Sequence, residues 1–158
     1  MVLKQLIKNL DYILKIIIKD ISSLGSLVFF GFVICFQFAL KNYFLSFKLL
    51  ISLIIAYLIV IIIRLTYYKQ RPNKQKYTNL LEKLDSSSFP SMHAIRIMLI
   101  GLFFIEFYKN YLIILLFLII ILMVGYSRYH LKKHYIIDIL AGYITGICIF
   151  LIINLVNF

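Results

Sequence analysis

Charged residues are scarce in this sequence of 158 residues: they make up 15% of it, whereas hydrophobic residues make up 63%. A soluble domain of this size could not cover so much apolar surface, so the composition excludes an ordinary water-soluble protein. Acidic residues are scarcest, with 6 against 17 basic ones and a net charge of +11. Because the basic residues lie beside long apolar runs, we expect anionic lipid head groups as their neighbours and no nucleic-acid partner.

Cysteine is present only twice, and both residues fall within apolar segments. Neither Cys35 nor Cys148 has a nearby base in the sequence that could activate its thiol. We therefore expect no disulfide between them and no redox or metal-binding role. The sequence predicts no cofactor and no obligate protein partner.

Proline is equally rare, and both prolines mark one polar region. Pro72 lies in the only long loop, residues 66–88, and Pro90 follows that loop directly. Proline suits the first position of a helix, where its missing N–H group is no loss. We therefore expect Ser91 and His93 in the first turn of the next helix.

Long apolar runs dominate the remaining sequence. A helix needs about 20 apolar residues to cross a bilayer core about 30 Å thick. The sequence therefore predicts an all-α integral membrane protein, a six-helix bundle in a single domain over residues 1–158. The five predicted spans are residues 21–40, 49–63, 89–105, 111–126 and 135–156.

The first segment, residues 1–20, has a different pattern. Lysines alternate with leucine and isoleucine at helical spacing, which predicts an amphipathic helix in the membrane interface, with a tilted sixth span as the alternative. The charges interrupt the apolar stretch and no small-residue cleavage site follows, so a cleavable signal peptide fits poorly.

Three polar motifs lie at the ends of the predicted spans, and counting spans places all three on one membrane face. They are Arg64 with Arg71 and Pro72; Pro90 to His93; and Ser127 and Arg128 with His134 and Asp138. Three guanidiniums can bind phosphoryl oxygens through paired donors, and Ser91 with a helix start adds further donors. The sequence therefore predicts a phosphate site formed by Arg64, Arg71, Ser91 and Arg128.

The histidines supply the chemistry of this site. His134 and Asp138 are four residues apart, so on one helix the carboxylate can bond one ring nitrogen and leave the other free to attack. His93 provides a second imidazole as proton donor. This set is sufficient for phosphoryl transfer without a metal, with His134, His93 and Asp138 as the catalytic residues.

These motifs resemble those of the type 2 phosphatidic acid phosphatases, which are related to vanadium haloperoxidases. The third motif matches in full at Ser127, Arg128, His134 and Asp138. The second matches with Met92 where glycine is usual, and the first with Arg64 where lysine is usual. The resemblance covers residues 64–138, and three spaced motifs in the right order are specific.

The resemblance implies that His134 forms a phosphohistidine and that Asp138 fixes its tautomer. His93 would protonate the leaving oxygen and then activate the hydrolytic water, while Arg64, Arg71 and Arg128 hold the phosphoryl oxygens together with Ser91. The implied substrate is a membrane lipid phosphate: phosphatidic acid, phosphatidylglycerol phosphate, undecaprenyl pyrophosphate or a lipid A phosphate.

Other functions stay open at this point. The chain could be a catalytically inactive protein that binds lipid phosphates, because Arg64 and Met92 depart from the usual motifs. A channel or permease gives no reason for the motif spacing, and haloperoxidase relatives are soluble. The cell membrane is the expected location. The positive-inside rule favours a cytoplasmic site, whereas the resemblance favours the external face, which we expect.

Overall fold

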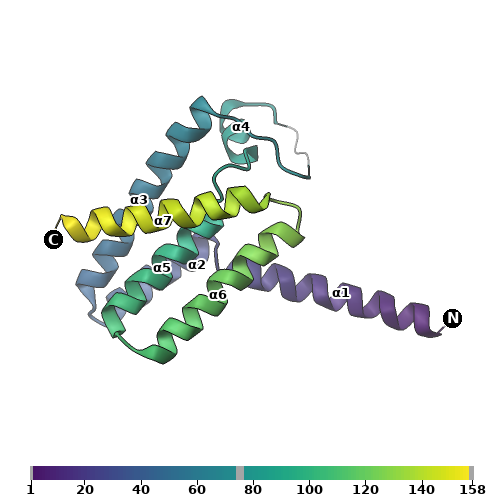
Figure 1. The fold of residues 1–158 in the computed structure, drawn as a ribbon, viewed down its shortest axis with the longest axis horizontal. Coiled ribbons are helices and arrows are strands. Elements are labelled where there is room, and N and C mark those ends of the chain that lie inside the picture. Colours follow the sequence, from purple (N-terminus) through teal and green to yellow (C-terminus); the bar gives the residue numbers. More distant parts are fainter. Residues whose placement is uncertain (1, 74–76, 157–158) are drawn as a thin grey trace.

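The computed structural model describes residues 2–73 and 77–156. These residues form seven α-helices and no β-strand, with one isolated antiparallel bridge between Gln70 and Ser87. The helices are α1 (Val2–Ser23), α2 (Leu27–Ala39), α3 (Tyr43–Thr66), α4 (Leu80–Ser86), α5 (Met92–Tyr108), α6 (Tyr111–His130) and α7 (Ile136–Leu155). The predicted all-α architecture is therefore confirmed (Figure 1).

Helix α5 is the centre of the bundle and packs against α2, α3, α6 and α7. Its packing with α7 is closest, because a Cβ atom added at Gly142 would lie 2.7 Å from the Ser91 carbonyl oxygen, and one at Gly146 would lie 3.0 Å from Met98 Cβ. Small residues four apart let two helices of a membrane protein approach closely. This contact brings the start of α7 beside the start of α5.

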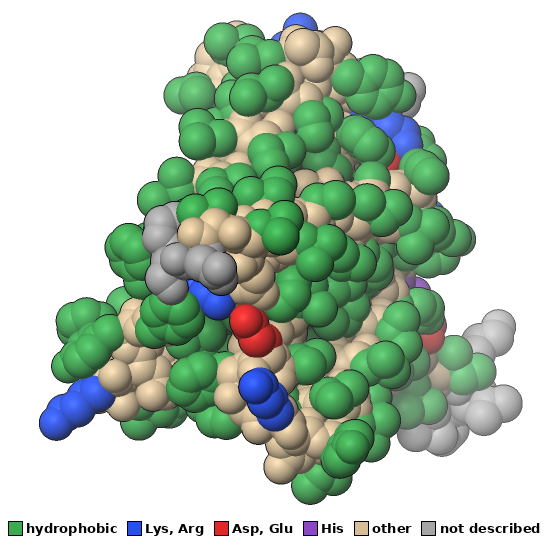
Figure 2. Space-filling model, turned by 60° about the vertical axis from the view of Figure 1, so that its left-hand side comes forward, with side chains coloured by type: hydrophobic (Ala, Val, Ile, Leu, Met, Phe, Trp, Pro, Cys, Tyr) green, Lys and Arg blue, Asp and Glu red, His purple; other side chains and the backbone are tan. Residues whose placement is uncertain are grey.

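The outer surface of the bundle is apolar. Figure 2 shows a face covered mostly by hydrophobic side chains, with few charged groups among them. Helices α3, α6 and α7 are long and apolar enough to cross a membrane, and α1 with α2 would form a fourth span if the bent pair is counted as one. These features indicate a multi-pass membrane protein. The predicted number of five spans is not confirmed, since α5 has only 17 residues and lies inside the bundle.

The predicted span over residues 21–40 is wrong in detail, because two helices share it. Helix α1 continues to Ser23, and α2 begins only at Leu27, at an angle of 50° to α1. Ser26 caps α2 through its Oγ, which accepts a hydrogen bond of 3.1 Å from the Phe29 amide. Sequence hydropathy missed the break because the short polar stretch around Gly25 does not interrupt the apolar run.

Helix α1 extends away from the bundle and contacts α6 (Figure 1). Its apolar side chains, including Leu10, Ile13 and Ile17, are exposed, which fits the predicted amphipathic helix. Placement in the membrane interface and participation in a tilted span both stay predictions.

The motif residues meet at one end of the bundle. Helix α3 ends there at Thr66, α5 begins there at Met92, α6 ends there at His130 and α7 begins there at Ile136. The short helix α4, which the sequence did not predict, lies at this end beside α3 (Figure 1). The arrangement inferred from counting spans is therefore found in the fold.

Candidate active site

A cavity of about 260 Å³ lies at this end of the bundle. It brings together residues from α3, α4, α5 and α6 and from the two loops that follow α3 and α6. Five of the seven predicted site residues line it, whereas Ser91 and Asp138 do not. The lining residues are Tyr57, Val60, Ile61, Arg64, Arg71, Leu81, Leu84, Asp85, Met92, His93, Arg96, Arg128 and His134.

His134 lies in the loop between α6 and α7 and is almost fully buried. Its Nδ1 is 2.7 Å from the Ser88 carbonyl oxygen. A carbonyl can only accept a hydrogen bond, so Nδ1 carries the proton and Nε2 keeps its lone pair. Nε2 lies 3.5 Å from Nη2 of Arg128. Burial first, and then the charge of Arg128, lower the pKa of His134 to about 3, so its ring is neutral at physiological pH.

Asp138 does not contact the His134 ring, and the predicted hydrogen bond between them is wrong. The Asp138 carboxylate is fully buried; Oδ1 lies 2.6 Å from Nζ of Lys69, and Oδ2 accepts a 2.9 Å hydrogen bond from the Tyr135 amide. Two residues four apart face each other only within one helix, and α7 begins at Ile136. His134 precedes that helix, so Asp138 instead caps its first turn.

The Ser88 carbonyl is held by a short backbone pairing between the loop after α3 and the segment before α5. The Ser88 amide donates to the Lys69 carbonyl oxygen at 2.8 Å, and Gln70 pairs with Ser87. Lys69 thus connects Asp138 through its side chain and Ser88 through its backbone. No pattern in the sequence indicated this role, because Ser88 ends a serine run typical of a linker and Lys69 is one of several charged residues in a loop.

Arg64 and Arg71 both bind backbone carbonyl groups at the cavity wall. Arg64 donates to Leu84 O at 2.9 Å, and also to the carbonyl oxygens of Pro90 at 3.1 Å and Phe89 at 3.3 Å. Arg71 donates through Nη2 to the Asp85 carbonyl oxygen, and burial lowers its pKa. These contacts fix the segment from α4 to α5 while the guanidiniums face the cavity.

Arg128 is held from the other side by the end of α1. Its Nη1 donates to Ser22 Oγ at 2.9 Å, and its buried Nε has no hydrogen-bond partner among the described residues. A buried donor without a partner is costly. Arg128 therefore keeps donor capacity that no group in the described part of the chain uses.

His93 lies in the first turn of α5, as expected, and lines the cavity. Gly25, at the break between α1 and α2, packs directly against it: a Cβ at Gly25 would lie 2.9 Å from both His93 Cβ and its carbonyl oxygen. Ser91 is the N-cap of α5, and its amide donates to the Asp138 carbonyl oxygen at 3.0 Å. Its Oγ is buried without a partner in the described part of the chain, so the predicted phosphate contact of Ser91 stays a prediction.

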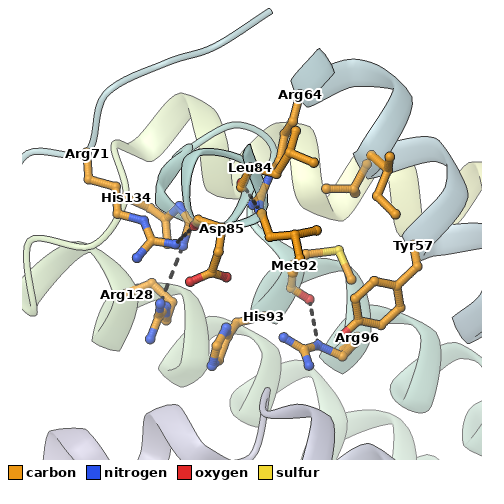
Figure 3. A pocket seen from close by; sticks show the side chains of 13 residues that line it. Tyr57, Arg64, Arg71, Leu84, Asp85, Met92, His93, Arg96, Arg128 and His134 are labelled. Atoms are coloured by element: carbon orange, nitrogen blue, oxygen red, sulfur yellow. Dashed lines mark hydrogen bonds between the residues drawn. The ribbon is translucent and has the colours of Figure 1, made fainter. Parts of the chain in front are cut away.

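The cavity also contains charged residues to which the sequence assigned no role. Asp85 of α4 is its only carboxylate among the described residues, and Figure 3 shows this carboxylate pointing into the cavity, toward Arg128 and His93. Arg96, one turn beyond His93 on α5, is the fourth guanidinium in the wall.

In the described ranges, no group of three or more His, Cys, Asp or Glu residues could hold a metal ion. Cys35 and Cys148 are both free, as expected.

Comparison with known proteins adds independent information about this end of the bundle. The family model of the PAP2 superfamily matches residues 45–158, which is more than half of the chain and includes all three motifs. The chain belongs to the PAP2 superfamily. The resemblance recognised in the sequence is therefore confirmed.

Two solved PAP2-type structures have similar folds. One is the transmembrane PAP2 type phosphatidylglycerolphosphate phosphatase from Bacillus subtilis, with a TM-score of 0.74 and 20% identity over 91% of this chain and 76% of that chain. The other is LpxE from Aquifex aeolicus, with a TM-score of 0.74 and 20% identity over 90% of this chain and 86% of that chain. No curated protein matches the chain. The protein thus has the fold of membrane PAP2 phosphatases.

Proposed function

We propose that this PAP2 protein is a metal-independent lipid phosphatase that acts through a phosphohistidine at His134. Its substrate carries a phosphate monoester or a diphosphate on the lipid head group, as in phosphatidic acid, phosphatidylglycerol phosphate, undecaprenyl pyrophosphate or a lipid A phosphate. One observation carries the proposal: Ser88 holds His134 Nδ1–H, so the unprotonated Nε2 is available in a cavity lined by four guanidiniums and His93.

In the first step, His134 Nε2 attacks phosphorus and forms the N–P bond while the P–O bond to the leaving group breaks. The leaving oxygen takes the electron pair and receives a proton from His93. In the second step, His93 accepts a proton from water, and the hydroxide attacks the phosphohistidine. Inorganic phosphate leaves and His134 is restored.

The cationic residues stabilise charge that develops on the phosphoryl oxygens. Arg128 is the best placed, because its Nη2 lies 3.5 Å from the attacking nitrogen. Arg64 and Arg71 also line the cavity and contribute further donors. Asp138 acts as a positioning residue, since it holds the start of α7 and Lys69 rather than the His134 ring.

The surroundings of the cavity suit a lipid substrate. Leu81 of α4, at the cavity edge, is 78% exposed, and Ile61 of α3 is also exposed. In a membrane these apolar side chains face lipid, so the reacting head group can enter sideways from the leaflet while its tail stays in the hydrocarbon.

The test is phosphate release from lipid phosphates by purified protein in detergent, with a metal chelator present. Wild-type protein should release inorganic phosphate, and His134→Ala should abolish release and any acid-labile phosphoenzyme. The matched control is His130→Ala, which removes an exposed histidine that does not line the cavity. Unchanged turnover in His134→Ala would reject the mechanism. Binding of lipid phosphate without turnover in the wild type would identify an inactive binding protein.

We also propose that the active site faces the outside of the cell. The arginines at this end line the cavity, so they are poor markers for the positive-inside rule. In protein lacking Cys35 and Cys148, a membrane-impermeant maleimide should label Thr78→Cys in intact cells but not Lys109→Cys. The reverse labelling would place the site inside.

A further inference from the structure

We propose that Arg96 forms a second anion subsite, and that the preferred substrate carries a second phosphate on its leaving group. The inference rests on the proposed lipid phosphatase activity and narrows its substrate class. It assigns Arg96, which belongs to none of the three motifs, as a residue that determines specificity.

Arg96 is a buried cation that forms no ion pair among the described residues, although the Asp85 carboxylate lines the same cavity. Its side chain belongs to a residue only 5% exposed, and its one hydrogen bond among the described residues runs from Nε to the Met92 carbonyl oxygen at 3.1 Å. Two acidic residues elsewhere in the bundle have other partners: Glu106 bonds Lys48 at 3.4 Å and Asp138 bonds Lys69 at 2.6 Å. Asp85, which lines the same cavity, forms no ion pair with Arg96.

A buried guanidinium without a paired anion is energetically costly. Among the described residues, the terminal nitrogens of Arg96 have no acceptor, and the residue lines the catalytic cavity. Figure 3 shows its guanidinium on the far side of His93 from His134 and Arg71. An anion bound in the cavity can therefore supply the acceptor that these terminal nitrogens lack, in competition with the Asp85 carboxylate.

The position of Arg96 assigns this anion to the leaving group. His93 is the proposed proton donor to the leaving oxygen, and Arg96 lies three residues further along α5, a rise of about 4.5 Å. Figure 3 shows Tyr57 of α3 beside Arg96, and Val60 and Ile61 of the same helix also line the cavity. This wall belongs to a helix whose outer face is apolar and exposed, so it is the side on which the lipid tail leaves the cavity.

The chemistry of a second phosphate fits this place. When the P–O bond at the reacting phosphorus breaks in a lipid diphosphate, the electron pair stays on the departing lipid monophosphate, whose charge increases. A guanidinium fork binds phosphate through two donors and stabilises that charge. A lipid with a single phosphate leaves as an alcohol after protonation by His93, and it offers Arg96 no anion.

The experiment compares the kcat/KM of wild-type, Arg96→Met and Arg96→Lys proteins on three lipids. These are a polyprenyl diphosphate, phosphatidylglycerol phosphate and phosphatidic acid, which carry the second phosphate directly, through a glycerol, or not at all. Arg96→Met should lower kcat/KM for a two-phosphate lipid about 10- to 100-fold relative to phosphatidic acid, the effect expected for a lost charged hydrogen bond. Arg96→Lys should fall between. The two-phosphate lipid that loses most identifies the spacing that Arg96 reads.

The matched control is Lys48→Met, which removes another buried cation, at the end of α3 away from the cavity. It should leave the ratio of kcat/KM between two-phosphate lipids and phosphatidic acid unchanged. Two outcomes in Arg96→Met would overturn the subsite: an equal loss of kcat/KM on all three lipids, or an unchanged kcat/KM on all three. Phosphate release from none of the lipids by the wild type would reject the proposed function instead.

A binding measurement distinguishes failure of the Arg96 subsite from failure of the proposed phosphatase activity. In the His134→Ala background, calorimetry with inorganic diphosphate and inorganic phosphate tests the subsite without turnover. Diphosphate should bind more tightly than phosphate, and adding Arg96→Met should remove that preference. If the preference survives the substitution, the second anion subsite is not at Arg96.

Discussion

The ion pair between Lys69 and Asp138 gives the sharpest prediction about stability. Replacing Lys69 with methionine leaves a fully buried carboxylate without its cation. Breaking a buried pair in this way costs about 3–5 kcal/mol, and because the Lys69 side chain is 24% exposed, water screens the pair and we expect about 3 kcal/mol. In a chain of this length, that loss lowers Tm by about 6–12 °C.

Thermal unfolding in detergent, followed by circular dichroism, measures this loss. The double variant Lys69→Met/Asp138→Asn should recover most of the Tm, because asparagine is neutral but still accepts from the Tyr135 amide. The control is Lys83→Met, an exposed lysine of α4 that forms no ion pair among the described residues. A Tm for Lys69→Met equal to that of this control would contradict the reasoning.

The same double variant tests how His134 is oriented. The Ser88 carbonyl oxygen, and not Asp138, accepts the Nδ1–H of His134. The turnover of the double variant should therefore lie within about tenfold of the wild-type turnover once its stability is restored. Loss of a carboxylate that orients a catalytic histidine costs about 10⁴-fold in hydrolase triads. A loss of that size in a double variant of normal stability would show that Asp138 orients the ring after all.

Two further predictions concern the catalytic histidines. Gly25→Ala should lower kcat at least about tenfold, because the new Cβ would lie 2.9 Å from His93 and displace it. The control is Gly31→Ala, whose Cβ meets nothing within 4 Å. Equal kcat values for the two variants would refute the contact between Gly25 and His93. Burial and the charge of Arg128 lower the pKa of His134 from 6.5 to about 3. At a pH between these two pKa values the unfolded chain therefore binds one more proton than the folded chain, and the stability of the fold decreases as the pH decreases. Between about pH 7 and 4, the Tm of wild type should therefore fall more steeply than that of His134→Gln, and parallel curves would exclude the pKa shift.

Most helices could be predicted from the sequence because their apolar runs are long and continuous. Four predicted segments correspond to α3, α5, α6 and α7, with ends that differ from the predicted ones by at most six residues. The break between α1 and α2 and the short helix α4 were missed. Each has only a short local signal, the N-cap residue Ser26 for α2 and Asn79 for α4. The contacts of Gly25 with His93 and of Leu84 with Arg64 join distant residues, which a local pattern does not show.

The candidate site, like the fold, was predicted from the sequence only in part. Motif order and span counting placed Arg64, Arg71, His93, Arg128 and His134 together, and all of them line one cavity. The role of Arg96 could not be decided from the sequence, because spacing alone does not show whether an acidic residue such as Glu106 or Asp138 pairs with it. Only the structure shows that both carboxylates are already bonded to lysines.

The sequence by itself determined the helical membrane architecture, the PAP2 motifs and the face on which they meet, because apolar runs and motif spacing are properties of neighbouring residues. The tertiary structure decided which group holds each functional side chain. Ser88 is 46 positions from His134, and Lys69 is 69 positions from Asp138. Hydrogen bonds over such separations depend on how helices pack. The partner of His134, and the absence of an ion pair at Arg96 among the described residues, therefore became visible only in the folded chain.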